Sequence, residues 1–241
     1  MTTAYSGDGI TFPDSTVQAT APKVGMVNRI INGDMRVSQR DGGAAISTEG
    51  TSYFNGAAYT LDRWNAIHAQ TAKFSVQQNA GSVTPPVGFS NYLGATSTSA
   101  YTVVAGDYFG FGQRIEGFNT ADLNWGTANA ATVTLYFWVR SSLTGTFGGA
   151  VSNSANNRSY AFNYTISSAN TWEKKTITIA GDTSGTWIGA TNGTGIQLTL
   201  PIAIGTTYAG TAGSWDSALY IGATGTTSVV GTSGATFYVT G

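Results

Sequence analysis

Acidic residues and a single histidine are the side chains of this sequence best suited to catalysis. Glycosidases place two carboxylates on either side of the bond that they cleave, and this chain of 241 residues contains only 12 Asp and Glu. Glu116 follows Arg114 on the same face of an expected strand, which favours an ion pair. Asp107 and Glu116 would form a catalytic pair only if the fold brought them together. We therefore expect no catalytic residues and a protein that is not an enzyme.

Metal-binding patterns are also missing from the sequence. His68 is the only histidine and there is no cysteine, whereas zinc centres take several such ligands. No Asp-rich calcium loop is present, although scattered loop oxygens can also hold calcium. We expect no cofactor and no metal site, with a structural calcium ion as the alternative. His68, near Trp64 and Ile67, is expected at the edge of the core.

Aromatic residues are the remaining candidates for a binding site. The chain has 6 Trp, 12 Tyr and 11 Phe, and an aromatic body with a polar edge suits contact with a sugar ring. Trp125, Trp187 and Trp215 lie in segments rich in Gly, Ser, Thr and Asn, which favour loops. They are our candidate carbohydrate-binding residues. Capping of the fold or filling of a subunit interface is the alternative role for these three side chains.

Composition and charge argue against several classes of partner. Charged residues make up 10% of the chain, the net charge is −1 and Lys and Arg are scattered, so we expect no binding to nucleic acid. The longest apolar runs, such as 135–139, are far shorter than the roughly 20 residues of a membrane-spanning helix. The N-terminus lacks the pattern of a signal peptide. We expect no membrane insertion and release by lysis.

Short strand patterns separated by turn residues occupy most of the chain. The 32 Gly and the many Ser, Thr and Asn disfavour long helices. The strongest pattern is TVTLYFWVR at Thr132–Arg140, which we expect to be a central strand buried on both faces, with Trp138 in the core or an interface. Helix is expected only as a turn near 119–123. Further strands are expected at residues 73–77, 101–104, 107–116, 160–166, 176–179, 195–204, 219–221 and 235–239. This spacing predicts an all-β sandwich or barrel.

The N-terminal residues form a separable segment. Alternating residues at 10–12 and 17–19 flank a Pro-Asp-Ser turn at 13–15, which predicts a β-hairpin. A lone hairpin is marginally stable in water, so it must pack on the main domain or on neighbouring chains. We expect residues 1–25 to be a hairpin arm and linker used for attachment or oligomer contact, and residues 26–241 to be one sandwich domain.

The order of several short motifs resembles a family of phage tail-fibre and virion-associated β-sandwich proteins. NRIINGDMRVSQR followed by YTLDRW resembles the opening of that family, and ATFYVTG resembles its final core strand. GFGQRIEG, TVTLYFWVRSSLTGTF and YAFNYTISSANTWEKKTITIAGDTSGTW resemble its middle. The middle also resembles jelly-roll carbohydrate-binding modules, in which a Trp opens a late strand as Trp172 does here. GITFPDSTVQATA resembles short hairpin segments of phage fibres.

This resemblance implies a jelly-roll-like sandwich located in the virion. The expected role is structural or adhesive, in a tail fibre or receptor-binding tip that binds host surface glycan. The motif order together with the dependent hairpin predicts a homotrimer, with other virion proteins contacting the arm. A capsid decoration or head-fibre protein and a glycan-cleaving tailspike enzyme are the alternatives. Family members usually continue beyond the last core strand, whereas this chain stops at Gly241, so a C-terminal region is expected to be missing, replaced or supplied by another chain.

Overall fold

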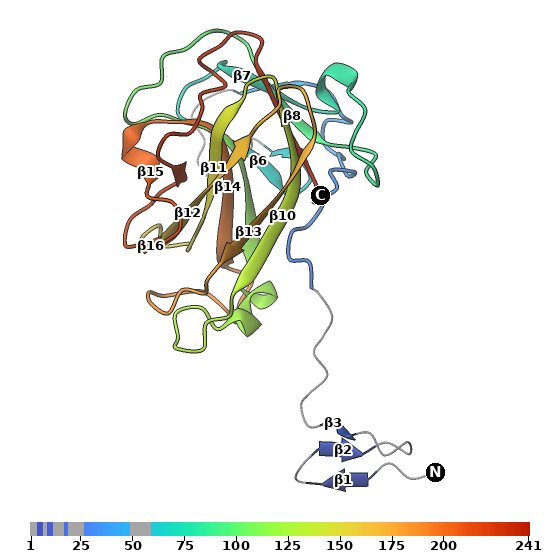
Figure 1. Cartoon of the computed structure of the whole chain (residues 1–241), viewed down its shortest axis with the longest axis vertical. Helices are drawn as coiled ribbons and strands as arrows, with labels where there is room; N and C mark the ends of the chain where they lie inside the picture. The colour runs from blue at the N-terminus through green and yellow to red at the C-terminus, as the bar shows by residue number, and fades with distance from the viewer. Residues whose placement is uncertain (1–3, 7–8, 12–16, 19–26, 49–58) are drawn as a thin grey trace.

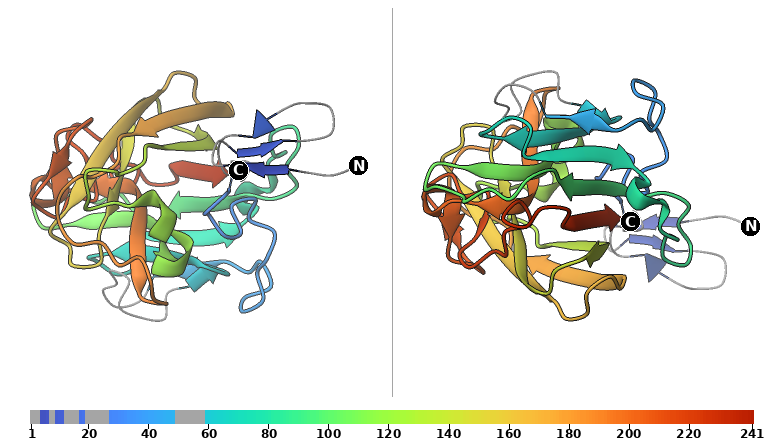
Figure 2. Two further views of the ribbon diagram at one scale, coloured as in Figure 1. Left: turned by 90° about the horizontal axis from the view of Figure 1, so that it is seen from below. Right: turned by 90° about the horizontal axis from the view of Figure 1, so that it is seen from above.

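The computed structural model of the protein describes residues 4–6, 9–11, 17–18, 27–48 and 59–241. Almost all of its regular structure is β (Figure 1). A six-stranded sheet has the order β13-β10-β18-β8-β7-β4, and a seven-stranded sheet has the order β16-β12-β11-β14-β9-β6-β5. The two sheets lie face to face (Figure 2). The predicted all-β sandwich is therefore confirmed.

The strands are short to medium in length and are joined by turns. The six-stranded sheet contains β13 (Glu173–Ile179), β10 (Val133–Ser141), β18 (Thr236–Thr240), β8 (Leu93–Ser97), β7 (Phe74–Gln78) and β4 (Ile46–Ser47). The seven-stranded sheet contains β16 (Trp215–Asp216), β12 (Ser159–Ile166), β11 (Gly145–Ser152), β14 (Thr194–Ile204), β9 (Tyr108–Glu116), β6 (Trp64–His68) and β5 (Tyr59–Leu61). The helical turns are η1 (Ala80–Ser82), η2 (Gly117–Asn119), η3 (Ala121–Leu123) and η4 (Thr206–Tyr208). In the described ranges, no helix has the length and apolar character needed to cross a membrane.

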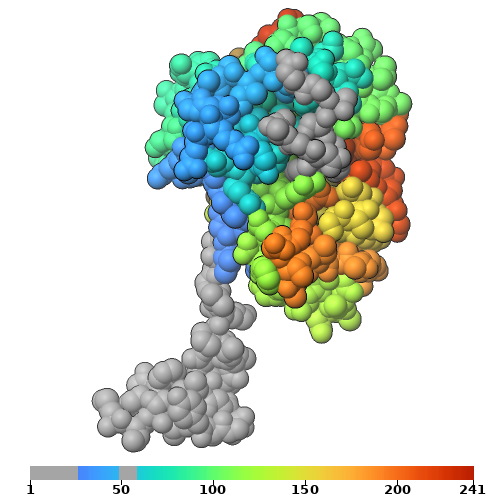
Figure 3. All heavy atoms as spheres, turned by 180° about the vertical axis from the view of Figure 1, so that it is seen from behind, coloured from blue at the N-terminus to red at the C-terminus, as the bar shows by residue number. Residues whose placement is uncertain are grey.

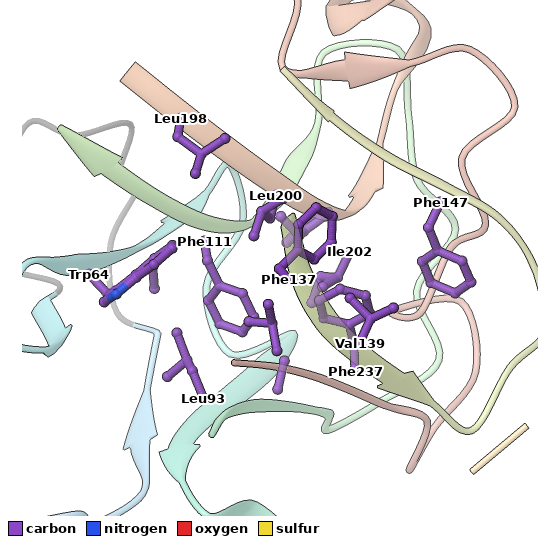
Figure 4. Close-up of a cluster of buried hydrophobic side chains, with 14 of the residues drawn as sticks. Trp64, Leu93, Phe111, Phe137, Val139, Phe147, Leu198, Leu200, Ile202 and Phe237 are labelled. Carbon is purple, nitrogen blue, oxygen red and sulfur yellow. The ribbon is translucent and has the colours of Figure 1, made fainter. Parts of the chain in front are cut away.

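One continuous core lies between the two sheets. Alternate residues of β9 and β14 point into it, and Leu200 is directly opposite Phe111 in their antiparallel pairing. Phe237 of β18 packs against Phe111 and Phe147, with ring centroids 6.4 and 5.7 Å apart. Figure 4 shows these side chains meeting from both sheets. Burial of each such side chain contributes about 1.5–3 kcal/mol, so this interdigitated layer holds the sheets together.

Strand β10 does not occupy the position predicted for it. The sequence predicted a central strand at Thr132–Arg140 with both faces buried, but β10 is second from the edge, with only β13 outside it. Phe137 and Val139 point into the core, whereas Tyr136 is exposed and Trp138 is half-buried on the outer face. Aromatic residues can occupy such a face because their rings pack while remaining partly wet. The apolar run was therefore wrongly interpreted as burial on both faces.

Two of the predicted strands are loops. Residues 101–104 form no strand, because the buried Asp107 carboxylate accepts hydrogen bonds from the Tyr101 hydroxyl and the Val104 backbone, each at 2.9 Å. Those bonds fold the segment into a turn instead of leaving its backbone to pair in a sheet. Residues 219–221 also form no strand. The strand begins one residue later, as β17 (Gly222–Ala223), which pairs in parallel with β15 (Ala209–Gly210).

The sequence also concealed a strand. β11 lies inside the seven-stranded sheet although GTFGGAVS has few apolar residues. A Cβ at Gly149 would lie 2.4 Å from the Phe162 ring and 2.6 Å from the Thr199 carbonyl oxygen. Glycine is required there because neighbouring strands approach too closely for any side chain. The glycines that signal a loop in the sequence therefore mark tight packing.

Residues 28–35 fasten the chain to the sandwich as it enters. The Gln113 side chain accepts from the Ile31 N–H and donates to the Ile31 carbonyl, both at 2.9 Å. The Trp64 indole donates to the Asn32 carbonyl at 3.1 Å. The Gly241 N–H donates to the Gly33 carbonyl at 2.8 Å, so the entering segment lies beside the last described residue (Figure 1). The NRIING motif is thus an anchoring segment.

Part of the outer face of the seven-stranded sheet is covered by the chain that follows β14. Ile67 of β6 and Ile221 are fully buried there, with Tyr108, Ile204 and Tyr208 around them. Farther along the same sheet, toward β5, the outward side chains are polar instead. This change from apolar to polar marks where the cover ends.

The N-terminal strands form a sheet of their own. β1 (Ala4–Ser6), β2 (Gly9–Thr11) and β3 (Val17–Gln18) pair in that order. The sequence predicted only the β2–β3 hairpin, so β1 is an additional strand. The predicted turn at 13–15 and the linker before residue 26 lie outside the described residues. The division into an arm and a sandwich domain stays a prediction.

Candidate functional site

The three tryptophans predicted as a binding site meet in one cluster. Trp125 follows η3, Trp187 lies in the loop after β13, and Trp215 begins β16. The Trp125 ring is 4.8 Å from Trp187 and 5.3 Å from Trp215, and those two are 5.4 Å apart, all edge to face. Edge-to-face geometry is the preferred packing of aromatic rings. We call the cluster the cap, because Trp125 closely follows η3, and the green coil of this segment lies at one end of the sandwich in Figure 1.

The polar edges of the three indoles are already used inside the protein. Trp125 Nε1 donates to the Ala131 carbonyl and Trp215 Nε1 to the Ala180 carbonyl, each at 2.8 Å. Trp187 Nε1 lies 3.2 Å from both Asp182 Oδ2 and the Ser184 carbonyl. Trp125 is buried and the other two rings are half-buried. Only parts of Trp187 and Trp215 therefore remain available to a ligand.

A buried ion pair supports the cap. The Arg158 guanidinium binds both oxygens of Asp182, with Nε–Oδ2 at 2.8 Å and Nη2–Oδ1 at 2.6 Å. The Asp182 side chain is 2% exposed, so this carboxylate depends on its partners for solvation. Its hydrogen bonds raise the pKa of Arg158 above the ordinary value, against the effect of burial. Asp182 is thus a structural residue that orients Trp187.

A larger and more polar cavity opens on the outer face of the seven-stranded sheet. Its volume is about 140 Å³, compared with about 40 Å³ for a cavity beside Trp125 and Trp187. We call it the sheet-face pocket, and it is lined by Tyr59, Arg63, Asn65, Arg114, Glu116, Asn192 and Thr194. Figure 3 shows the side of the molecule on which the cyan, green and orange segments that carry these residues adjoin.

Strand alternation explains why polar side chains gather there. Trp64 and Ile115 point into the core, so their neighbours Asn65, Arg114 and Glu116 point outward. Glu116 of β9 pairs directly with Thr194 of β14, which places the ends of the two strands together. β5 and β6 complete the wall as an antiparallel hairpin. Most of the lining residues therefore lie on strands, with Arg63 on the β5–β6 turn and Asn192 in the loop before β14.

Glu116 and Arg63 form the charged floor of the pocket. Arg63 Nη2 lies 2.5 Å from Glu116 Oε1 and 3.0 Å from the Arg114 carbonyl oxygen. Burial acts to raise the pKa of Glu116, but hydrogen bonds from its own backbone amide, Arg63 and Asn119 outweigh this, and the pKa is lowered. Glu116 is therefore ionised at neutral pH. The sequence predicted Arg114 as its partner and missed Arg63.

An aromatic ring and a further arginine stand at the rim. Tyr59 is 37% exposed, and the Arg40 guanidinium lies over its ring, 4.6 Å from the centroid. Such cation–π contacts fix both side chains. Sequence reasoning missed Tyr59, Arg63 and Asn65, because YTLDRW at 59–64 was considered only for its resemblance to phage fibre proteins. For Asn65, a parity opposite to that of the buried Trp64 was the available signal. Tyr59 shares the parity of the buried Leu61 but is exposed where the pairing of β5 with β6 shifts register between them, and the sequence does not show that shift.

The carboxylates considered for catalysis are kept apart. Asp107 precedes β9 and Glu116 ends it, so the nine-residue strand separates them by about 3.3 Å per residue. Asp107 is 2% exposed and accepts a further hydrogen bond from Gln70 at 3.2 Å. His68 is fully buried, deeper than the predicted core edge, with its ring edge-on to Phe74. Among the described residues, no three His, Cys, Asp or Glu gather as a metal site.

Comparisons with known proteins include a weak structural likeness. No family model matches the chain, and no curated protein matches it. Among solved structures, it is similar to the enzymatically active domain of tailspike protein 4 of bacteriophage CBA120, with a TM-score of 0.38 and 12% sequence identity. The match covers 73% of this chain and 18% of that chain.

This likeness corrects one expectation. From the sequence we expected a protein that is not an enzyme, whereas the similar domain is enzymatically active. The prediction is wrong as a classification, because the lack of a catalytic motif in the sequence does not define a non-enzyme.

Proposed function

We propose that this chain recognises a glycan through the sheet-face pocket, as part of a phage tail fibre or tailspike. The observation that carries the proposal is the pocket itself, in which an exposed Tyr59 ring stands beside guanidinium, carboxylate and amide groups. Sugar hydroxyls both donate and accept hydrogen bonds, and Arg63, Asn65 and Glu116 supply both kinds of partner. The apolar C–H face of a sugar ring suits the Tyr59 ring.

Rigidity supports the same proposal. Asn65 and Glu116 lie on paired strands, and Arg63 is held by Glu116 and by the Arg114 carbonyl. Side chains fixed in this way lose little conformational entropy when a ligand binds. A pocket of about 140 Å³ also has space for several water molecules, since one needs roughly 10–15 Å³. A polar ligand that displaces them retains their hydrogen-bonding partners.

The tryptophan cluster is proposed as a second contact for a longer glycan. Trp187 and Trp215 are half-buried, which leaves part of each ring for stacking. Trp125 serves mainly to hold the other two in position, because it is 7% exposed and contacts both.

Location and assembly are proposed from the sequence motifs. Their order resembles phage fibre proteins, which supports a place in the virion. The strands β1–β3 contain only two or three residues each, and sheets this small need a packing partner to be stable. This supports a homotrimer and contacts with other virion proteins through the arm. Imaging of the particle would distinguish a tail component from a capsid decoration or head fibre.

Cleavage of the bound glycan is the second candidate. The observation that favours it is Glu116, an ionised carboxylate in the wall of the pocket. In that state it suits a base or nucleophile and not a proton donor. The Glu116→Gln variant would then lose release of reducing ends from the glycan to a far greater extent than it weakens binding of the glycan.

Replacement of Tyr59 tests the proposed function. We expect Tyr59→Ala to weaken glycan binding about tenfold, since an aromatic contact and its neighbouring hydrogen bonds are lost. Tyr136→Ala is the matched control, because Tyr136 is 40% exposed on the outer face of the other sheet. A glycan array identifies ligands, and calorimetry measures their affinity. If wild type and Tyr59→Ala both bind a glycan with the same affinity, the binding site lies elsewhere on the protein.

A further inference from the structure

We infer that a small cavity in the cap binds the acetamido group of an N-acetylated sugar. This inference rests on the proposed function and names the class of glycan. The cavity, of about 40 Å³, lies beside Trp125 and Trp187, and we call it the cap cavity. The glycan that places an acetamido group there also reaches the sheet-face pocket, so that one ligand occupies both sites.

Two short segments of the chain separate the cap cavity from the sheet-face pocket. In the first segment, Glu116 lines the sheet-face pocket and Thr120 lines the cap cavity. In the second segment, Asn192 lines the sheet-face pocket and Gly189 lines the cap cavity. The Cα atoms of these last two residues are at most about 11 Å apart, because each residue extends the chain by no more than about 3.6 Å. A short oligosaccharide covers such a distance.

An exposed aromatic residue lies between the two cavities. Phe118 is midway between Glu116 and Thr120 in the first segment, and its backbone N–H donates to the Thr191 carbonyl of the second segment at 2.9 Å. The Phe118 side chain is 65% exposed. Single exposed apolar side chains are common on proteins, but an aromatic ring at this place offers a surface on which a sugar ring stacks. We assign Phe118 to the glycan between the two cavities.

The size and the lining of the cap cavity suit the methyl end of an acetyl group. Its volume of about 40 Å³ holds about three water molecules, because each needs roughly 10–15 Å³. A sugar ring is larger than this volume, whereas an acetyl group is close to it. The rings of Trp125 and Trp187 and the side chains of Ile188 and Ile196 form an apolar lining. Burial of a methyl group against them is therefore favourable.

Asn124 supplies a polar partner for the same group. It is an exposed residue of the cavity lining, and its Nδ2 donates to the Asp122 carbonyl at 3.1 Å, which orients the amide and leaves Oδ1 as an acceptor. An acetamido N–H can donate to that oxygen, whereas an O-acetyl group and the methyl group of a 6-deoxy sugar have no N–H. The described residues that line the cavity are uncharged, so a charged amino group would lose hydration there without an ionic partner.

The test compares glycans that differ in one substituent, on the full-length protein. Chitohexaose, its de-N-acetylated form and cellohexaose share one backbone and carry an acetamido, an amino or a hydroxyl group at the same carbon. We expect the acetamido form to bind and the other two to bind at least about tenfold more weakly, because a buried methyl group and a hydrogen bond are lost. O-acetylated and 6-deoxy glycans on an array present a methyl group without the N–H, and we expect them to bind more weakly as well.

Substitutions at Gly189 assign the effect to the cap cavity. A Cβ at this position would lie 3.6 Å from the Ala121 Cβ, which is an ordinary contact, so Gly189→Ala and Gly189→Val should fold and narrow the cavity in two steps. Affinity for chitohexaose should fall in the same order, by about tenfold for the larger side chain. Gly106→Ala is the control, because an added Cβ there meets open space. Thermal unfolding of each variant checks that it is folded.

Replacement of Phe118 tests the path between the cavities. Phe118→Ala should weaken binding of chitohexaose about tenfold, since a stacking surface is lost, and should leave the melting temperature nearly unchanged because the side chain is exposed. Tyr136→Ala is the matched control, an exposed aromatic residue on the other sheet. An unchanged affinity of Phe118→Ala would remove this residue from the path.

The outcomes separate this inference from the proposed function. Equal binding of chitohexaose and cellohexaose, or chitohexaose binding that both Gly189 variants leave unchanged, would overturn the acetamido assignment while leaving glycan recognition intact. O-acetylated or 6-deoxy glycans bound as tightly as N-acetylated ones would show that the N–H is not recognised and would overturn the class named. The inference is also overturned if glycans bind through Tyr59 and none of them is N-acetylated. A blank glycan array would defeat both proposals.

Discussion

Two buried tyrosine hydroxyls have opposite environments in this sandwich. Tyr92 Oη donates to the Ala80 carbonyl at 2.5 Å and accepts the Val83 N–H at 2.9 Å. Tyr164 Oη is buried with no hydrogen-bond partner within the described part of the chain, between Phe137 and Phe147. Burial raises the pKa of Tyr164 well above its ordinary value, so the hydroxyl is neutral. An unpaired buried hydroxyl costs stability, whereas a paired one contributes to it.

Removal of each hydroxyl should therefore change stability in opposite directions. Tyr164→Phe is expected to raise the free energy of unfolding by about 1 kcal/mol, because it deletes an unsatisfied polar atom. Tyr92→Phe is expected to lower it by about 1 kcal/mol or more. Chemical denaturation of both variants beside wild type measures the difference. A destabilised Tyr164→Phe would show that the hydroxyl has a partner after all.

Single residues also set the limit of inference from sequence. Alternation predicted the inward side chains of β9, β12 and β14 because a strand period of two is a local property. The Arg63–Glu116 pair could not be predicted, because it depends on how the β5–β6 turn lies against the end of β9. Trp125 and Trp187 lie outside the strands as predicted, whereas Trp215, also predicted in a loop, begins β16. The mutual contacts of the three rings required the fold.

At the scale of elements, the cap at one end of the sandwich depends on the loop after β13. Asp182 holds that loop through Arg158, the Ser184 N–H and the Trp187 indole. One carboxylate thus binds two groups of its own loop and the distant Arg158. The sequence suggested only a polar turn at Asp182, since neither burial nor the distant arginine is visible locally.

Asp182→Asn should therefore weaken the cap. It leaves the Arg158 guanidinium, 14% exposed, without its charged partner, and breaking a buried ion pair costs about 3–5 kcal/mol. Thermal unfolding measures the loss, and a red shift of tryptophan emission reports the loosened cluster. Asp122→Asn is the control, because the Asp122 side chain, which pairs with Arg29, is 66% exposed. Equal melting temperatures for Asp182→Asn and wild type would contradict a structural role for the pair.

Among the strands, the local sequence pattern predicted which segments form a strand better than it predicted where each strand lies in its sheet. The ranges 107–116, 160–166 and 195–204 match β9, β12 and β14 to within a residue. β10 was found but misplaced, because an apolar run cannot show whether its second face meets solvent. β11 was missed because its glycines are required by close contact with Phe162 and Thr199. Those residues belong to other strands, so the local sequence of β11 does not show the contact.

At the scale of the whole molecule, the sandwich and the N-terminal sheet differ in how much buried core is available to stabilise them. The sandwich buries a large continuous core between two sheets, whereas β1–β3 are strands of two or three residues. A small sheet of this kind contributes little to folding by itself. Its value is expected to lie in contacts between chains.

Deletion of residues 1–25 tests that division. We expect the remaining 26–241 domain to unfold at nearly the same temperature as the full chain, because its core is untouched. The proposed homotrimer should not form, since the deletion removes the segment to which we assign oligomer contact. Sedimentation and calorimetry on both proteins measure these quantities. A stable trimer of the shortened chain would place the subunit interface on the sandwich.

The bond between Gly33 and Gly241 has a mechanical consequence. Because these two residues are adjacent, tension applied between the start of the sandwich and its last residue is met first at this contact. The force would then detach β18 and the hydrogen bonds of Gln113 one after the other. It would not shear both sheets at the same time. In single-molecule pulling, an early low-force step followed by a larger rupture is the signature of that geometry, and the inner core would stay relaxed until the first step had passed.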